Sequence, residues 1–202
     1  MAKGRKGGKG DIPTAIEILE QEDFFELWQG KLFLGQEFLT WLWLRTEGDG
    51  RTMRLPNGHE VEVWFENQLQ LSLGSGQTKR SVSITTTEEP ADGDWMEAYT
   101  ALAQHKKVSK GTLRVRTGPS EWRFTLSHDT LIPQGIRLST KSAPEDTEEL
   151  GKEGRVLERL SSTAELLNIL EGLFKVFIRL RVSPEWDKKE LPRLQGFLDS
   201  QK

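Results

Sequence analysis

Few residues of this chain have the types and spacing that catalysis requires. Ser127, His128 and Asp129 are the three residue types of a hydrolytic triad, in which the histidine activates the serine hydroxyl. They are consecutive, however, and consecutive side chains of a strand point to opposite faces. Glu60 and Glu62 are two residues apart and share a strand face, as paired metal-binding carboxylates do. A solvated sheet face explains this pair more simply. A nuclease that holds a metal ion with these two carboxylates ranks third among our three hypotheses for the function.

The composition narrows the chemistry further. The 202 residues include no cysteine, which excludes disulfides, thiolate metal sites and cysteine nucleophiles and fits a reducing cytoplasm. The three histidines are far apart in the sequence, and no glycine-rich phosphate loop ends in Lys-Ser or Lys-Thr. We therefore expect a protein that is not an enzyme and that uses no metal ion and no cofactor.

Basic residues cluster near the middle of the chain. Overall, 28 lysines and arginines against 31 acidic residues give a net charge of −3. Between positions 104 and 123 only Glu121 opposes six basic side chains, a local charge of +5: Lys106, Lys107, Lys110, Arg114, Arg116 and Arg123. Such a cluster contacts DNA phosphates without reading the bases, and we take these six as candidate DNA-binding residues. The alternative is a solvated strand face with scattered salt bridges.

The segments around this cluster predict an antiparallel sheet built from hairpins. Asn57-Gly58 separates two alternating segments, 51–55 and 59–65, and Asn-Gly is the strongest short hairpin signal. Further strands are expected at 68–73, 79–86, 112–117 and 121–126, and an edge strand at 131–138, where Pro133 and Gly135 interrupt the pattern. A helix capped by Asp94 is expected to end at residues 105–107, which would let Lys106 and Lys107 extend the basic patch.

Two apolar helices are expected to pack against this sheet. Residues 32–44, LFLGQEFLTWLWL, form the most apolar segment and are too few to cross a membrane. Phe38, Trp41 and Trp43 of this segment belong to the core or, alternatively, to a self-association interface. Apolar residues at helical spacing from about 152 to 181 predict a long amphipathic helix that Ser183-Pro184 ends. The fold class is therefore α+β, with a Trp-rich helix and a long C-terminal helix on an antiparallel sheet.

One domain is expected, from residue 11 to residue 186. A flexible basic tail, MAKGRKGGKG at 1–10, precedes it and lacks the apolar segment of a secretory signal. A first helix is expected between Asp11 and Gly30, and residues 187–202 form a tail or a short helix. The sequence has no run of about 18 apolar residues, so we expect no membrane span.

Three stretches, in the same order, resemble the recombination-associated protein RdgC family. They are FLGQEFLTWLWLRTEGDGR (33–51), HKKVSKGTLRVRTGPSEWRFTLSHDTL (105–131) and VLERLSSTAELLNILEGLFKVFIRLRVSPEW (156–186), of which the middle one is the weakest. Members of that family carry a substantial region before the first stretch, whereas only about thirty residues precede it here. The chain therefore resembles the C-terminal portion of an RdgC protein.

The resemblance implies binding of duplex DNA without sequence preference, in DNA recombination or nucleoid organisation, with modulation of RecA. RdgC proteins form ring-shaped dimers around DNA, so it also implies a homo-oligomer that associates with the nucleoid. The six candidate DNA contacts come from local charge and not from the family. Our second hypothesis is a protein–protein assembly module of phage or mobile-element origin, joined through the Trp-rich helix and the long helix.

Overall fold

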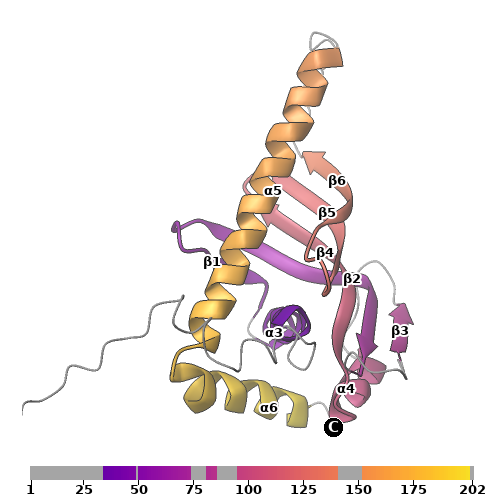
Figure 1. The fold of residues 1–202 in the computed structure, drawn as a ribbon, viewed down its shortest axis with the longest axis vertical. Coiled ribbons are helices and arrows are strands. Elements are labelled where there is room, and N and C mark those ends of the chain that lie inside the picture. The colour runs from indigo at the N-terminus through magenta and orange to yellow at the C-terminus, as the bar shows by residue number, and fades with distance from the viewer. Residues whose placement is uncertain (1–33, 49, 74–80, 86–94, 141–151, 201–202) are drawn as a thin grey trace, which may run out of the picture. The chain divides into compact units, whose positions relative to one another are not determined.

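The computed structural model describes residues 34–48, 50–73, 81–85, 95–140 and 152–200 (Figure 1). Within these residues the chain forms six strands in one antiparallel sheet and four α-helices, which confirms the α+β class. The predicted basic tail at 1–10 and the helix predicted between Asp11 and Gly30 lie outside the described residues.

The sheet has the order β1-β2-β4-β5-β6, and β3 pairs with the second half of β2, on the side opposite β4. The strands are β1 (Thr52–Arg54), β2 (Glu60–Ser72), β3 (Ser81–Thr85), β4 (Lys107–Thr117), β5 (Ser120–Ser127) and β6 (Gln134–Thr140). The predicted edge position of the last strand is confirmed, because β6 is at the end of this order.

The hairpin at the start of the sheet follows from the local sequence, whereas the bulge in its second strand was not predicted. Gly58 has a φ of +87° in the turn between β1 and β2, a conformation that glycine adopts without steric cost. The two strands predicted at 59–65 and 68–73 are one strand of 13 residues. Its register shifts between Phe65 and Leu69, so that residues 66–68 of β2 stand opposite Thr112 alone.

The helices are α3 (Leu34–Gly48), α4 (Met96–Ala103), α5 (Lys152–Arg181) and α6 (Leu191–Ser200), with a π-helical turn at Trp186–Glu190. The prediction that α5 spans about 152 to 181 is confirmed. The prediction that α4 ends at 105–107 is wrong: the helix stops at Ala103, His105 has a φ of +64°, and Lys107 already begins β4. Asp94 lies outside the described residues.

None of the helices that the structure describes is long and apolar enough to cross a membrane.

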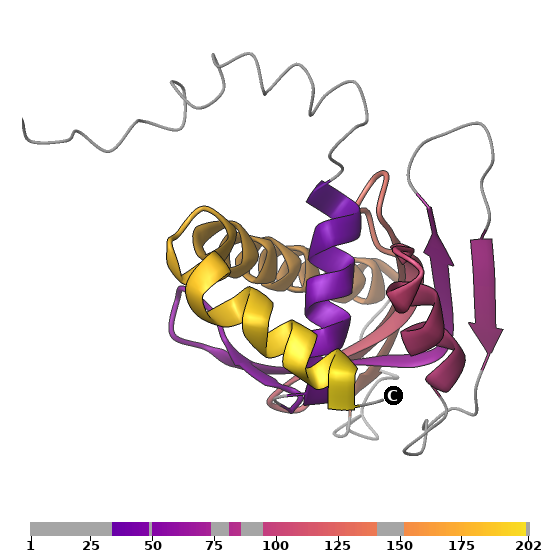
Figure 2. The ribbon, with the colours of Figure 1, turned by 90° about the horizontal axis from the view of Figure 1, so that it is seen from below.

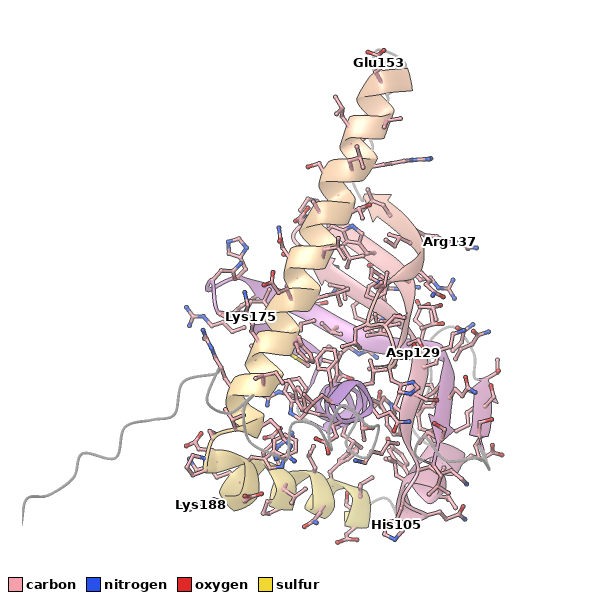
Figure 3. The ribbon with its side chains drawn as sticks, in the orientation of Figure 1. His105, Asp129, Arg137, Glu153, Lys175 and Lys188 are labelled. Carbon is pink, nitrogen blue, oxygen red and sulfur yellow. The ribbon has the colours of Figure 1, made fainter. Side chains whose placement is uncertain are left out.

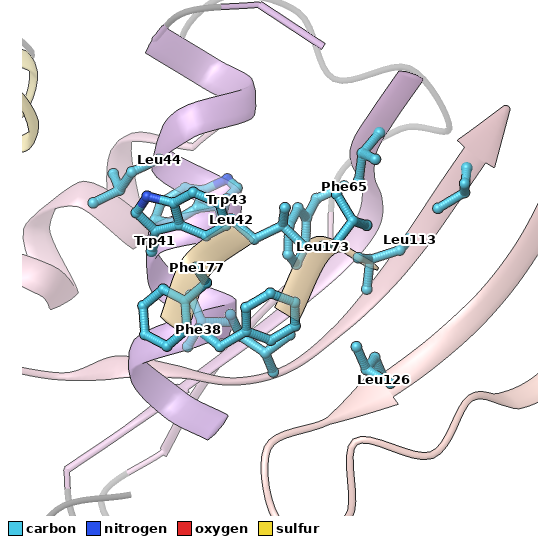
Figure 4. Close-up of a cluster of buried hydrophobic side chains, with 14 of the residues drawn as sticks. Phe38, Trp41, Leu42, Trp43, Leu44, Phe65, Leu113, Leu126, Leu173 and Phe177 are labelled. Atoms are coloured by element: carbon cyan, nitrogen blue, oxygen red, sulfur yellow. The ribbon is translucent and has the colours of Figure 1, made fainter. Parts of the chain in front are cut away.

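The hydrophobic core lies between α3, α5 and one face of the sheet (Figures 2 and 4). Phe38, Trp41 and Trp43 are 2%, 1% and 0% exposed. Of the two roles predicted for them, core packing and a self-association interface, the structure shows core packing, because side chains this deeply buried cannot contact a partner in this conformation. Phe177 of α5 packs against Phe38 and Trp41, with ring centroids 5.6 and 5.4 Å apart. Of the tail or short helix predicted at 187–202, the structure shows a helix, α6, whose Leu194 is buried in the same core.

Candidate nucleic-acid interface

The sheet has a second face, opposite α3 and α5, and four of the six candidate DNA-binding residues lie on it. Lys110, Arg114 and Arg116 occupy alternate positions of β4, and Arg123 of β5 is paired in register with Arg114. The apolar residues between them, such as Val115, are buried on the helix side. The sheet therefore brings these four side chains together, and we call this surface the open face.

The other two candidates, Lys106 and Lys107, lie elsewhere. Lys106 is 9% exposed, and its Nζ donates a hydrogen bond of 2.8 Å to Oε1 of Gln104. The Nζ of Lys107 is 3.3 Å from Oε1 of Glu37, which belongs to α3 on the covered side of the sheet. The expectation that both lysines extend the patch is not met, because the chain turns at His105 instead of continuing as a helix.

Three of the four basic residues on the open face form ion pairs with glutamates. Glu66 in the bulge of β2 is fully buried, and its two carboxylate oxygens contact Arg114 and Arg123. Glu62 contacts Arg116 in the same way. A salt-bridged strand face, the alternative considered from the sequence, therefore describes this part of the surface, and its local charge is largely compensated.

Trp64 orders two of these arginines, Arg114 and Arg116, together with Arg51. Its indole ring lies beneath the guanidinium carbons of Arg51, Arg114 and Arg116, which are 5.5, 5.6 and 5.7 Å from the ring centroid. Cation–π attraction of this kind holds the three guanidinium groups in a defined arrangement above the sheet. The positions of these three arginines, which we call the arginine cluster, are therefore fixed by a side chain of the sheet itself.

Beside this cluster, two adjoining hollows of about 270 and 180 Å³ open at the bulge of β2. They share Gln68, Thr112 and Thr125, and together we call them the polar groove. Its amides come from β2, and its hydroxyl groups come from serine and threonine residues of β3, β4 and β5. Three cations line it, Lys110, Arg123 and Arg137, and no described carboxylate does.

Arg137 is a basic residue of the groove that the sequence reasoning missed. It is paired in register with Arg123, and it projects from β6 on the side away from α5 (Figure 3). A signal was present, because Arg137 alternates with Ile136 and Leu138 in the predicted edge strand. Within the described residues neither Arg137 nor Lys110 forms an ion pair, so no described carboxylate compensates these two charges.

The two catalytic arrangements considered from the sequence are not assembled as their chemistry requires. The Ser127 side chain forms a hydrogen bond with the carboxylate of Asp129. This hydrogen bond, opposed by burial, holds the pKa of Asp129 below its usual range. The Nδ1 of His128 is 2.9 Å from the carbonyl oxygen of Ser109, whereas in a triad this nitrogen faces the carboxylate. Glu62 is paired with Arg116, and no group of three or more potential metal ligands occurs among the described residues.

The fold thus defines an α+β protein with helices over one face of its sheet and a polar, cationic groove on the other. No family model, curated protein or solved structure matches the chain. The RdgC resemblance therefore stays a prediction from the sequence.

Proposed function

We propose that this is a non-catalytic protein that binds duplex DNA without sequence preference, through the polar groove of the open face. The observation that carries the proposal is the lining of the groove. It combines three cations with hydroxyl and amide groups and contains no described carboxylate. Arginine, lysine, hydroxyl and amide groups are the partners that phosphate and sugar oxygens use in protein–DNA complexes.

The structure changes which residues we expect to contact the phosphates. Arg114 and Arg116 are two of the six predicted contacts, but Glu66 and Glu62 already compensate their charges. Lys110 and Arg137 are the two cations of the groove that have no acidic partner among the described residues. Arg123 also lines the groove, but Glu66 compensates it as it compensates Arg114. The two uncompensated cations provide two phosphate contacts, for which the logarithm of the affinity should fall with the logarithm of salt concentration with a slope of about −2.

We place this binding in DNA recombination or nucleoid organisation, with an effect on RecA-dependent reactions. Only the RdgC resemblance of the three segments at 33–51, 105–131 and 156–186 supports this part of the proposal. The backbone-binding activity itself is supported by the groove and does not depend on that resemblance.

The test is fluorescence anisotropy of a labelled random-sequence duplex, titrated with the protein from low to physiological salt. The variant with both Lys110→Ala and Arg137→Ala should bind every sequence more weakly and should flatten the salt slope by about 2. A variant with Arg179→Ala and Lys188→Ala loses the same two charges from exposed positions on α5 and the π-helical turn. It should bind like the unmodified protein, and equal losses in the two variants would overturn the assignment to the groove.

A further inference from the structure

The last strand of the sheet, β6, has an outer edge that pairs with no described strand. It is hydrogen-bonded to β5 on its inner side and ends the order β1-β2-β4-β5-β6. Residues of an antiparallel strand direct their N–H and C=O groups alternately to the two sides, so every second residue of β6 directs both groups away from β5. Among the described residues none forms a hydrogen bond with these outward groups. The edge is therefore a template for one more strand.

The helix α5 extends beyond this edge (Figure 1). It lies over β5 at Ser162, because Nε1 of Trp122 donates a hydrogen bond of 2.8 Å to Oγ of Ser162. The helix begins at Lys152, ten residues earlier, which corresponds to a length of about 15 Å. Beyond β5 the sheet adds only β6, with a width of about 4.8 Å. The helix therefore covers room for a further strand beside β6, even where it crosses the strands obliquely.

The part of α5 above this room is exposed. Residues 156–161 are all exposed, and the side of the helix that faces the sheet carries Arg159 there. Arg159 lies seven residues, almost two turns, before Leu166, which is completely buried, so the two residues share one face of the helix. Within the described residues Arg159 forms no ion pair. The sheet thus ends before it covers a face of α5 that carries an uncompensated charge.

A second arginine lies on the other side of the edge. Arg137 of β6 projects to the open face, and no described carboxylate compensates it (Figure 3). Its neighbour Leu138 is paired in register with Trp122, on the helix side, and is 37% exposed. A strand added beside β6 would therefore meet Arg137 on one face and Leu138 and Arg159 on the other.

We propose that the edge of β6 binds an extended acidic segment of a partner protein, which adds to the sheet as a further strand. Backbone hydrogen bonds to β6 provide the attachment, and the arginines on the two sides of the edge select carboxylates. Nucleic acid does not match this edge, because it has no regular row of N–H and C=O groups.

A second copy of this chain fits the edge poorly. Arg137 is the central residue of β6, which spans Gln134–Thr140. Antiparallel pairing of the whole strand with itself therefore sets Arg137 against Arg137 of the second copy. Like charges directly opposite each other destabilise a pair of strands. The charge that opposes self-pairing attracts an acidic strand.

Isothermal titration calorimetry and amide hydrogen exchange test the proposal on the full chain. The probe is a capped nine-residue peptide in which pairs of glutamates alternate with pairs of valines, so that both faces of the strand carry carboxylates. It should bind, and it should slow the exchange of amides in β6. The same peptide with lysine in place of glutamate should not bind. Absence of binding by the acidic peptide, equal binding of both peptides, or binding without slower exchange in β6 would overturn the proposal.

A charge reversal on α5 tests the role of the helix. Arg159→Glu should weaken binding of the acidic peptide about tenfold, because it replaces an attraction by a repulsion. Arg179→Glu is the matched control, since Arg179 is an exposed arginine of the same helix, about 30 Å further along it. It should bind the peptide like the unmodified protein, and equal losses in the two variants would contradict the assignment to this edge.

The same two variants separate this inference from the proposed function. Arg137 belongs to both surfaces, but Arg159 does not line the polar groove. Arg159→Glu and Arg179→Glu should therefore bind duplex DNA equally well in the anisotropy assay. Failure of the peptide to bind leaves the DNA assay unaffected, and failure of DNA binding leaves the peptide assay unaffected.

Discussion

The indole Nε1 of Trp41 donates a hydrogen bond of 2.8 Å to Oε1 of Glu190, a residue 149 positions later in the chain. The same carboxylate oxygen is 3.3 Å from Nη1 of Arg45 and 2.8 Å from Nη2 of Arg193. The Glu190 side chain is 9% exposed, so an indole and two guanidinium groups compensate a nearly buried charge. This contact joins the π-helical turn and α6 to α3, and it makes the C-terminal region part of the core.

We expect Glu190→Gln to reduce stability in a pH-dependent way. Burial raises the pKa of Glu190, but hydrogen bonds from Arg193 and Trp41 and the charges of Arg193 and Arg45 outweigh it and hold the pKa below its usual 4.5. A carboxyl with a lowered folded-state pKa stabilises the protein above its unfolded pKa and loses that contribution as the pH falls through the folded value. The variant should therefore be less stable than the unmodified protein at pH 7, and the difference should shrink below about pH 4.5.

Urea unfolding from pH 7 to pH 3 measures this difference. Asp187→Asn serves as the control, because Asp187 lies in the same π-helical turn and is exposed. A difference between Glu190→Gln and the unmodified protein that stays constant across this range would contradict the role of the charge.

Arg114→Ala and Arg116→Ala should differ in their effect on stability. Both guanidinium groups lie over Trp64, so both variants lose a cation–π contact. Arg114, however, compensates Glu66, which is fully buried, whereas the Glu62 side chain beside Arg116 is 38% exposed. We expect Arg114→Ala to cost about 2–3 kcal/mol and Arg116→Ala about 1 kcal/mol or less, measured by chemical denaturation. Equal losses would show that the burial of Glu66 has no energetic consequence.

Gly111→Ala should destabilise the sheet, because a Cβ at this position would be 2.6 Å from Cε1 of Phe65. The Phe65 side chain is 1% exposed, so its ring would have to move within the packed core. We expect a loss of about 1–3 kcal/mol, seen as a lower thermal unfolding midpoint. In Gly196→Ala a Cβ meets nothing within 4 Å, and in the helix α6 alanine is favoured by up to about 1 kcal/mol. A loss for Gly196→Ala as large as that for Gly111→Ala would contradict the steric explanation.

Much of the fold could be predicted because its signals are local. The Asn57-Gly58 turn, the alternation in β4 and β5 and the helical spacing of α5 depend on residues next to each other in the chain. The structure confirms these elements, and it confirms β6 as an edge strand. Its departures arise from longer-range effects. The two predicted strands at 59–65 and 68–73 remain one strand because β4 pairs with both parts across the bulge.

The candidate site could be predicted only in part, because charge compensation depends on residues that are distant in the sequence. Neighbouring residues suffice to show that Arg114 and Arg116 share one face of a strand. That Glu66 lies between Arg114 and Arg123 follows from the bulge of β2 and its pairing with β4. The same pairing of strands sets Arg137 beside Arg123, while the turn at His105 takes Lys107 to Glu37 on the covered side. The sequence alone shows which residues are basic and which are acidic. Which of these charges remain without a partner depends on strand register, because an ion pair requires its two atoms to lie within about 4 Å of each other.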